Sequence, residues 1–378
     1  MSRRILLYYP PNKRSVAIET LCTAVKDAGH ELIVLTFTGK DSFHLQMEKM
    51  GFMTFTTVME RKPSWKYYLN QARFLIRFCK ENKIDYVWSH LQEANIIAVL
   101  AQPFLKAKVV AFRHHAESAF YAEYGQKFGM VRNKNEIVFD KIINRLAKTI
   151  VIPSSGVWYG MEKYEGCNMK KVKLIPYIYN FSTYQQPSQD KVKLLRDEYK
   201  CELLLIMVSR MVASKQHMPV FKILNKLVKE GMSIRMIVMD DGPLRPALEE
   251  YVVQHNLANQ ISFVGYRNDF INYMAASDLL IHPSLTEASN NVVKELGILE
   301  KAVAVCERVG DFNDYIVEGR NGFLIDRGDL ENSTEKIIRT AYAKKDILTQ
   351  LGKELKKDIL EIFSDSSKNR KRLIDLIE

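Results

Sequence analysis

The 378-residue sequence contains no apolar run near the roughly 18–20 residues that a membrane-spanning helix needs. Its N-terminal apolar run is short, Ile5–Tyr9, and two prolines follow at once. We therefore expect a first strand there and neither a signal peptide nor a transmembrane helix.

Cysteine is scarce, and its five copies are scattered without a C-x-x-C pair. They are Cys22, Cys79, Cys167, Cys201 and Cys306. An odd count at wide spacings argues against disulfides and against a structural zinc site. This usage agrees with a reducing compartment, so we expect a cytoplasmic protein. The sequence also lacks short internal repeats and low-complexity tracts.

The charge balance is basic, with 55 Lys and Arg against 44 Asp and Glu and a formal net charge of +11. A positive surface favours nucleic acid, an anionic membrane or a phosphorylated substrate. No nucleic-acid-binding motif is present, so we expect no nucleic-acid partner. Charge alone does not choose between the other two.

Short apolar runs alternate with helical patterns through the first half of the chain. The expected strands are Ile5–Tyr9, Glu31–Phe37, Tyr86–Ser89, Lys108–Phe112 and Thr149–Ile152. The expected helices are Ile18–Ala28, Tyr67–Asn82, Glu93–Leu105 and Asn135–Ala147. This β-α-β-α order predicts a parallel, doubly wound sheet.

The same order repeats in the second half, after a polar stretch from Ser182 to Asp190 that we interpret as an interdomain linker. The expected strands are Leu203–Ser209, Ile234–Met239, Ile261–Val264, Leu279–His282 and Ala302–Cys306. The expected helices are Pro219–Glu230, Leu244–His255, Phe270–Ala276 and Asn290–Leu299. Two α/β domains are therefore predicted, with a ligand-binding cleft outside the carboxyl ends of their strands.

Arg210 and Lys215 follow the strand Leu203–Ser209. A forked guanidinium and a compact ammonium at one strand end suit a diphosphate. The alternative is a solvated basic loop.

Asp240, Asp241, Gly242 and Pro243 follow the strand Ile234–Met239. Gly242 permits a tight turn near a ligand, and proline suits a first helical turn. Paired aspartates can hold a divalent metal, but adjacent ones before Gly-Pro favour an ordinary turn. We expect no metal site.

Glu287 and Glu295 lie on either side of a predicted helix start, where Ser289 or Asn290 is a suitable N-cap. Free backbone N–H groups and a positive dipole end make such a start attractive to an anion. The two carboxylates can accept bonds from a ribose diol and from sugar hydroxyls on either side of a bound phosphate. The alternative is a pair of surface glutamates flanking a capped helix.

Taken in order, these residues resemble the large retaining glycosyltransferase family called group 1, or family 4. The match covers roughly residues 203–329. The resembling segments are Ser209-Arg210-Met211 with Lys215 (G-R-L-x-x-x-K-G), Asp241-Gly242-Pro243 (G-x-G-P), Phe263-Val264-Gly265 (F-x-G), Pro283-Ser284 with Glu287 and Glu295 (P-S-x-x-E-x(7)-E) and Asn321-Gly322-Phe323-Leu324 (N-G-F-L). Asp240 stands where the pattern often has glycine, and Asp311 where it has a second glycine.

The resemblance implies the GT-B fold: two Rossmann-like doubly wound domains facing each other across a cleft, with a C-terminal helix that crosses back to the N-terminal domain. It assigns residues 1–181 and 362–378 to an acceptor-side domain, and 182–361 to a donor-binding domain. We also expect no cofactor, because a nucleotide diphosphate sugar serves as co-substrate.

The resemblance also implies roles for single residues. Arg210 and Lys215 would bind the donor diphosphate, and Glu295 the ribose. Glu287 would contact the transferred sugar. The other implied donor-site residues are Asp241, Gly242, Gly265, Tyr266, Ser289, Asn290 and Asn291. With His114, the residues Arg210, Lys215 and Glu287 form the implied catalytic set.

The N-terminal half departs further from the family pattern. Related sequences have a Gly-Gly loop after the first strand, whereas this chain has Pro10-Pro11-Asn12-Lys13-Arg14. Asn12, Lys13 and Arg14 are therefore acceptor-side candidates, together with Arg113 and His115. The family histidine that faces the donor sugar corresponds to His114 by spacing, with His115 the alternative.

The implied reaction is the transfer of a hexose or N-acetylhexosamine from a nucleotide diphosphate sugar, with retention and without a metal. We expect a UDP-sugar, because such donors are frequent in this family. The implied acceptor is a glycan or lipid-linked glycan of cell-surface polysaccharide or glycoconjugate synthesis. The alternatives are a nucleotide-sugar epimerase of similar fold and a non-catalytic nucleotide-sugar binder.

A membrane contact is a further hypothesis, because the segment from Arg61 to Phe78 mixes cations with aromatic residues. Such a face can rest on an anionic membrane, which would make the protein peripheral on its inner face. A solvated helix with a buried aromatic stripe is the alternative.

Overall fold

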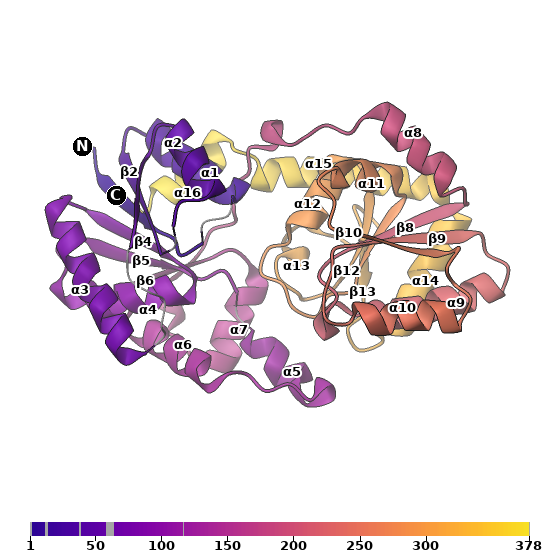
Figure 1. Cartoon of the computed structure of the whole chain (residues 1–378), viewed down its shortest axis with the longest axis horizontal. Coiled ribbons are helices and arrows are strands. Elements are labelled where there is room, and N and C mark those ends of the chain that lie inside the picture. Colours follow the sequence, from indigo (N-terminus) through magenta and orange to yellow (C-terminus); the bar gives the residue numbers. More distant parts are fainter. Residues whose placement is uncertain (1, 12–13, 38, 58–63, 116, 378) are drawn as a thin grey trace. The chain divides into compact units, whose positions relative to one another are not determined.

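The computed structural model describes residues 2–11, 14–37, 39–57, 64–115 and 117–377. The chain divides into two compact units, one formed by Met1–Asn180 with Phe363–Glu378 and the other by Phe181–Ile362. Each unit contains one parallel sheet accompanied by helices (Figure 1). The expected α/β class with two doubly wound, Rossmann-like parts is confirmed.

The first unit contains a seven-stranded sheet in the order β3-β2-β1-β4-β5-β6-β7. Its strands are β1 (Arg4–Tyr8), β2 (Glu31–Thr36), β3 (Met53–Thr56), β4 (Tyr86–His90), β5 (Lys108–Phe112), β6 (Thr149–Ile152) and β7 (Val172–Leu174). Every neighbouring pair is parallel. The order reverses at β1, as in other doubly wound sheets.

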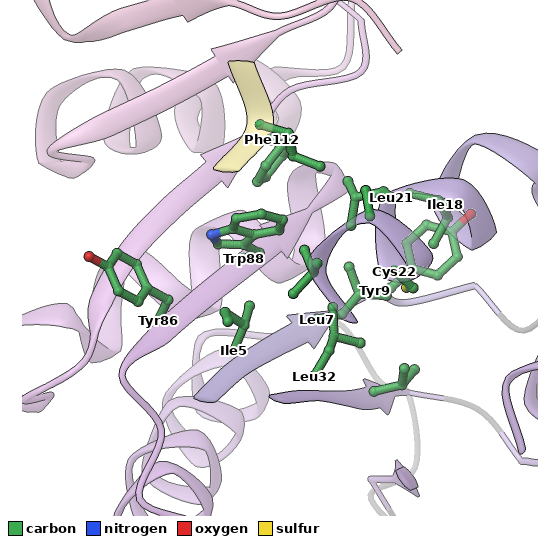
Figure 2. Close-up of a cluster of buried hydrophobic side chains, with 14 of the residues drawn as sticks. Ile5, Leu7, Tyr9, Ile18, Leu21, Cys22, Leu32, Tyr86, Trp88 and Phe112 are labelled. Carbon is green, nitrogen blue, oxygen red and sulfur yellow. The ribbon is translucent and has the colours of Figure 1, made fainter. Parts of the chain in front are cut away.

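The central strands of this sheet are buried on both faces, which explains why they read as continuous apolar runs. Ile5 and Leu7 of β1 and Trp88 of β4 have no exposed surface. Figure 2 shows them packed with side chains of α1, among them Ile18 and Leu21.

The helices of the first unit are α1 (Val16–Asp27), α2 (Ser42–Lys49), α3 (Trp65–Glu81), α4 (Leu91–Ala101), α5 (Ser118–Phe128), α6 (Lys134–Leu146), α7 (Ser155–Glu165) and α16 (Ser367–Ile374). Several begin at a side-chain cap. In α3, the Ser64 hydroxyl accepts a hydrogen bond from the Tyr67 N–H at 3.2 Å, which satisfies one free donor of the first turn.

The C-terminal segment belongs to the first unit, as expected for a helix that returns to the N-terminal part of the chain. The Tyr86 hydroxyl donates to the carbonyl of Ile377 at 2.6 Å. Arg370 of α16 pairs with Asp27 at the end of α1, at 2.7 Å. Residues far apart in sequence thus close one core.

The second unit contains a six-stranded parallel sheet in the order β10-β9-β8-β11-β12-β13. Its strands are β8 (Leu203–Val208), β9 (Ile234–Met239), β10 (Ile261–Gly265), β11 (Leu279–His282), β12 (Ala302–Cys306) and β13 (Phe323–Ile325). The order reverses at β8. The residues that follow β8, β9 and β11 therefore gather at one edge of the sheet.

The helices that begin in the second unit are α8 (Gln189–Glu198), α9 (His217–Lys229), α10 (Arg245–Gln254), α11 (Phe270–Ala276), α12 (Asn291–Ile298), α13 (Phe312–Tyr315), α14 (Leu330–Ala343) and α15 (Lys345–Phe363). Close packing fixes α12 against α15, because a Cβ at Gly297 would overlap the Ile359 side chain. This contact secures the helix whose start carries several of the predicted site residues.

Three strands, β3, β7 and β13, were not expected as strands, and all three lie at the edges of their sheets. β3 and β7 are short and partly exposed, so they lack the apolar run on which the other strands were predicted, and β13 is apolar but only three residues long. The polar stretch Ser182–Asp190 also has more structure than a linker. It includes part of a 3₁₀ turn, Phe181–Thr183, and the first residues of α8.

Candidate functional site

The central cluster of the second unit joins residues that follow β8 and β11. The Lys215 ammonium lies 2.5 Å from the Glu287 carboxylate and also donates to the Ser284 hydroxyl at 3.0 Å and the Thr286 carbonyl at 3.3 Å. Two residues that the sequence placed in one predicted site are thus in direct contact.

Glu287 has a second partner, His282, which is the last residue of β11 and is 2 % exposed. The His282 Nε2 lies 2.8 Å from Glu287 Oε1. Because a carboxylate can only accept, the imidazole carries its proton on Nε2 and donates it. Sequence reasoning missed His282, and the only available signal was its place at a strand end.

These contacts hold Glu287 in its ionised form. Burial by itself raises the pKa of this carboxyl, but the hydrogen bond and charge of His282 and the charge of Lys215 together bring the pKa well below its usual range. An ionised carboxylate can accept hydrogen bonds but cannot donate a proton. Glu287 is therefore suited to holding hydroxyl groups and not to general-acid catalysis.

The start of α12 lies directly after this cluster. The Asn290 side chain is its N-cap and accepts from the Val293 N–H at 3.0 Å, while Asn291 begins the helix and is exposed. The Ser289 hydroxyl donates to Asp311 at 2.6 Å. The predicted capped helix start is therefore present.

Glu295 lies in the second turn of α12 and is half-buried. Burial raises its pKa to about 7, against the opposing charge of Lys294. Its charge in turn adds to burial in raising the pKa of the nearby Tyr184 hydroxyl. The two glutamates of the motif thus have opposite electrostatic environments, since Glu287 is ionised and Glu295 titrates near neutrality.

Arg210 follows β8 and is exposed. Among the residues that the structure describes, its guanidinium has neither a hydrogen bond nor an ion pair. Its loop is tied to the turn after β9, because the Met211 N–H donates to the Asp241 carbonyl at 2.9 Å and the Leu244 N–H donates to the Met211 carbonyl at 3.1 Å.

Gly242 allows this close approach of the two loops. A Cβ at Gly242 would lie 2.5 Å from the carbonyl oxygen of Met211 and 2.6 Å from its nitrogen. Asp240, which stands where the family pattern has glycine, has a φ of 84° in the left-handed region. The Asp241 side chain accepts from the Gly242 N–H at 2.7 Å, so this aspartate shapes the turn.

The turn after β10 carries the two residues predicted for the base. Gly265 has a φ of 65° and contributes its carbonyl to the Asp240 N–H at 3.1 Å. Tyr266 follows it and is 81 % exposed. An exposed ring beside a tight turn can stack on a planar ligand.

In the first unit, His114 follows β5 and contacts two aromatic side chains. Its Nε2 lies 2.9 Å from His90 Nδ1, and its Nδ1 forms a short hydrogen bond with the Tyr177 hydroxyl. Burial, with a smaller effect from the charge of His115, lowers the pKa of His114 to about 3. His114 is therefore neutral near pH 7, with both ring nitrogens occupied. His115 is exposed.

Two of the other acceptor-side candidates, Arg113 and Arg14, already form ion pairs within the protein. Arg113 is buried and pairs with Glu165 at 2.5 Å and Asp140 at 2.9 Å. Arg14 binds Glu19 through two hydrogen bonds of 2.8 Å. Asn12 and Lys13 lie outside the described residues. Arg113 and Arg14 therefore do not offer free guanidinium groups.

Two features are absent from the described residues, one concerning metals and one concerning membranes. No three His, Cys, Asp or Glu side chains there come together as a metal ion would require. No helix in the same part of the chain combines the length and the apolar character of a membrane span.

Two family models match the chain. The model described as glycosyl transferases group 1 matches residues 202–342, and the model described as glycosyltransferase family 4 matches residues 15–180. Together they cover most of both units.

Curated relatives are distant in sequence. A putative colanic acid biosynthesis glycosyltransferase, WcaL of Salmonella typhimurium, is 19 % identical, and the match covers 97 % of this chain and 96 % of that protein. The alpha-monoglucosyldiacylglycerol synthase of Acholeplasma laidlawii is 20 % identical over 83 % of this chain and 81 % of the synthase. An uncharacterized glycosyltransferase of Methanocaldococcus jannaschii is 19 % identical over 66 % of this chain, which spans 62 % of its length.

Solved structures agree on the fold. The crystal structure of Alr3699/HepE of Anabaena in complex with UDP-glucose superposes with a TM-score of 0.79 at 18 % identity and covers 99 % of both chains. TarM superposes with a TM-score of 0.78 at 10 % identity, over 100 % of this chain and 99 % of TarM. With both family models matched and this fold shared, the chain belongs to the group 1 glycosyltransferases of GT-B fold and is a glycosyltransferase.

Proposed function

We propose that this glycosyltransferase transfers a hexose or N-acetylhexosamine from a UDP-sugar to a glycan or lipid-linked acceptor, with retention and without a metal ion. The observation that carries the proposal is the cluster of Lys215, Glu287 and His282, together with the exposed Arg210 that follows the same strand as Lys215. It combines positive charge for a diphosphate with an ionised carboxylate for sugar hydroxyls.

The donor residues have separate roles. Arg210 and Lys215 bind the diphosphate, and backbone N–H groups at Ser289 and Asn291 add to its stabilisation. Asn290, whose own N–H donates to Asp311, contributes as the N-cap of the helix start. Glu287 accepts from hydroxyls of the transferred sugar and Glu295 from the ribose. Asp241 and Gly242 shape the loop beside Arg210, while Gly265 and Tyr266 line the base. With His114, the residues Arg210, Lys215 and Glu287 are the proposed catalytic set.

Negative charge grows on the diphosphate as the bond to the sugar breaks. Cations and oriented N–H groups placed where that charge develops can lower the barrier without a metal. Two carboxylates flanking the reacting carbon would indicate a covalent double displacement. The family pattern offers no such pair, so we propose attack from the side of the leaving group within an ion pair.

Retention can be tested by proton NMR of the product anomer formed from a UDP-α-sugar. An α-linked first product supports retention, and a β-linked one contradicts it. Metal independence is tested by activity after treatment with EDTA, where full activity is expected and a loss that Mg²⁺ or Mn²⁺ restores would contradict the proposal.

The relatives support the choice of substrates. HepE was crystallised with UDP-glucose, WcaL is named for a polysaccharide pathway, and the Acholeplasma enzyme is named for a glycolipid. We propose the same classes of donor and acceptor here, used in cell-surface polysaccharide or glycoconjugate synthesis in the cytoplasm.

In the first unit, His114 is proposed to act on the transferred sugar and His115 is the alternative. Because His90 and Tyr177 occupy both nitrogens of His114, its role requires the release of one of them. Separate alanine variants decide between the two: the larger loss of kcat identifies the histidine that acts. Arg14, Arg113 and His115 stay proposed only as neighbours of the acceptor.

A peripheral contact with the inner face of the membrane is a further part of the proposal. Trp65, Lys66, Leu69, Arg73 and Arg77 of α3 are exposed and mix apolar with basic side chains. Part of the predicted segment, Arg61–Pro63, lies outside the described residues. Co-sedimentation with anionic vesicles at low salt is expected, and its absence would contradict the contact.

The function is tested with a panel of nucleotide sugars, scored by thermal shift and by nucleotide release with a lipid-diphosphate-linked glycan acceptor. A UDP-sugar should raise Tm and release UDP only when acceptor is present. Interconversion of the donor sugar without release of UDP would indicate an epimerase. A thermal shift without either reaction would indicate a non-catalytic binder.

A further inference from the structure

A buried ion pair lies next to the start of α12. Lys294, in the first half of that helix, and Asp311, just before α13, are each 1 % exposed, and their charged atoms are 2.6 Å apart. Burying two charges is costly, so a pair of this kind needs further hydrogen bonds to be stable.

Those further bonds go to the loop before α12. The Lys294 ammonium also donates to the Ser289 hydroxyl and the Asn290 carbonyl, each at 3.0 Å. Asp311 accepts from the Ser289 hydroxyl at 2.6 Å and from the Asn290 N–H at 3.4 Å. Lys294 thus has an acceptor for each of its three protons, and two of the three are in this loop.

The same loop contacts the donor cluster. The Asn290 side-chain nitrogen lies 3.2 Å from His282 Nε2, the atom that binds Glu287. On the other side, Gly310 packs on Glu287, because a Cβ at Gly310 would lie 2.9 Å from the Glu287 Cβ. Gly310 therefore supports Glu287, and Asp311 supports the loop that follows it.

The pair is neutral as a whole. Asp311 by itself would place a negative charge beside the N–H groups proposed for the donor diphosphate, and Lys294 cancels that charge at 2.6 Å. A neutral pair can therefore order the loop without repelling an anionic ligand.

We propose that Lys294 and Asp311 are positioning residues that hold the Ser289–Asn290 loop in the conformation that receives the donor diphosphate. The inference rests on the proposed function for its ligand. Neither residue needs to contact the donor, since each acts through Ser289 and Asn290.

The test distinguishes an effect on the conformation of the Ser289–Asn290 loop from an effect on the stability of the whole protein. Lys294→Met leaves Asp311 as an unpaired buried charge and should lower Tm by about 10 °C. Lys294→Met with Asp311→Leu removes both charges and should restore most of that Tm. Lys294→Met keeps the bonds from the loop to Asp311, whereas the double variant removes every bond of the pair to the loop, so UDP affinity should be at least tenfold below wild type in the Met/Leu variant.

Hydrogen–deuterium exchange of the peptide spanning 286–292 gives a readout without nucleotide. Exchange should rise at least tenfold in the Met/Leu variant. Lys294→Met with Asp311→Asn keeps an amide oxygen that can accept from Ser289, so its exchange and UDP affinity should return to within about threefold of wild type. The ion pair Lys226 and Glu335 of the same unit, in which Lys226 is exposed and Glu335 partly buried, provides the control. In Lys226→Met with Glu335→Leu, neither the exchange of peptide 286–292 nor the UDP affinity should change.

Ser289→Ala decides the question should the Met/Leu variant not fold. It removes one hydroxyl and leaves the ion pair intact, so Tm should stay near wild type while exchange rises and UDP affinity falls by at least threefold. Wild-type exchange and UDP affinity in Ser289→Ala, or in a stable Met/Leu variant, would overturn the inference.

The two proposals can fail separately. A wild-type protein that binds no UDP would overturn the proposed function, while the exchange of nucleotide-free protein would still report whether the pair orders the loop. Faster exchange with unchanged UDP affinity would overturn the positioning role alone.

Discussion

The Lys215 ammonium lies 2.5 Å from the Glu287 carboxylate, although 72 residues separate them in the sequence. The contact links the loop after β8 to the loop after β11 and largely cancels both charges. In the proposed site, the positive charge for a diphosphate therefore comes first from Arg210, which is exposed and has no acidic partner among the described residues.

Replacing Lys215 by alanine should lower kcat/KM for the donor by at least 100-fold. It leaves Glu287 buried without its cation, so the free energy of unfolding should also fall by about 3 kcal/mol. Steady-state kinetics and urea unfolding measure the two effects. Lys222→Ala, on the exposed face of α9, is the control and should change neither. Unchanged kinetics in Lys215→Ala would exclude it from the site.

Replacing Arg210 by alanine should weaken UDP binding with little effect on the stability of the fold. The side chain is exposed, so Tm should change by less than about 2 °C. UDP affinity should fall at least tenfold, because the main unneutralised cation of the site is lost. Isothermal titration calorimetry gives the affinity, and Arg372→Ala in α16 is the control. Equal UDP affinities for Arg210→Ala and wild type would contradict the assignment.

Glu295 should make nucleotide binding depend on pH. Its folded-state pKa of about 7 lies above the ordinary value of 4.5, so the folded protein binds this proton more tightly than the unfolded chain. Its contribution to stability is therefore full below about pH 4.5 and is lost as the pH rises through 7. Because a ribose diol donates to the ionised form, UDP binding should release up to one proton near pH 6.5.

Calorimetry in buffers of different ionisation enthalpy measures that release. Glu295→Gln should abolish it and flatten the dependence of Tm on pH between 4.5 and 7. The exposed Glu250→Gln should behave like wild type. A wild-type protein that binds UDP with no proton release at pH 6.5 would contradict the role of Glu295.

Gly242→Ala should damage the site through the backbone. The added Cβ would meet the Met211 backbone at 2.5 Å, so the turn after β9 and the Arg210 loop must separate. We expect a loss of about 1–3 kcal/mol in unfolding free energy and at least tenfold weaker UDP binding. Gly39→Ala, where a Cβ meets nothing within 4 Å, is the matched control. Wild-type UDP affinity in Gly242→Ala would show that the loop contact does not matter for the donor.

Arg113→Met tests whether this residue stabilises the fold. It strips a buried cation from Glu165 and Asp140, so stability should fall by roughly 3–5 kcal/mol. Denaturant unfolding measures the change, and the exposed Arg73→Met on α3 is the control. A stable Arg113→Met variant with a raised acceptor KM would instead favour the acceptor-side role predicted from sequence.

The sequence by itself determined the architecture of the chain. The central strands are continuous apolar runs because helices cover both faces of each sheet, and β8 and β9 were predicted within one residue of their ends. The parallel β-α-β connections, also predicted from the sequence, place the residues after successive strands at one edge of a sheet. The sequence pattern alone therefore suffices to predict that Arg210, Lys215 and Glu287 share one site, of which the Lys215–Glu287 contact is present in the structure.

Only the tertiary structure decided how those groups are paired and charged. His282 and Lys294 carry no local pattern, because a buried histidine or lysine is recognised by the partner across the fold and not by its neighbours in sequence. Asp311 is only a departure from a glycine pattern in the sequence, and its contact with Lys294 gives it a role. The electrostatic difference between the two glutamates has the same character. Burial raises the pKa of both carboxyls, and only at Glu287 do His282 and Lys215 bring the pKa down, although both residues belong to one motif.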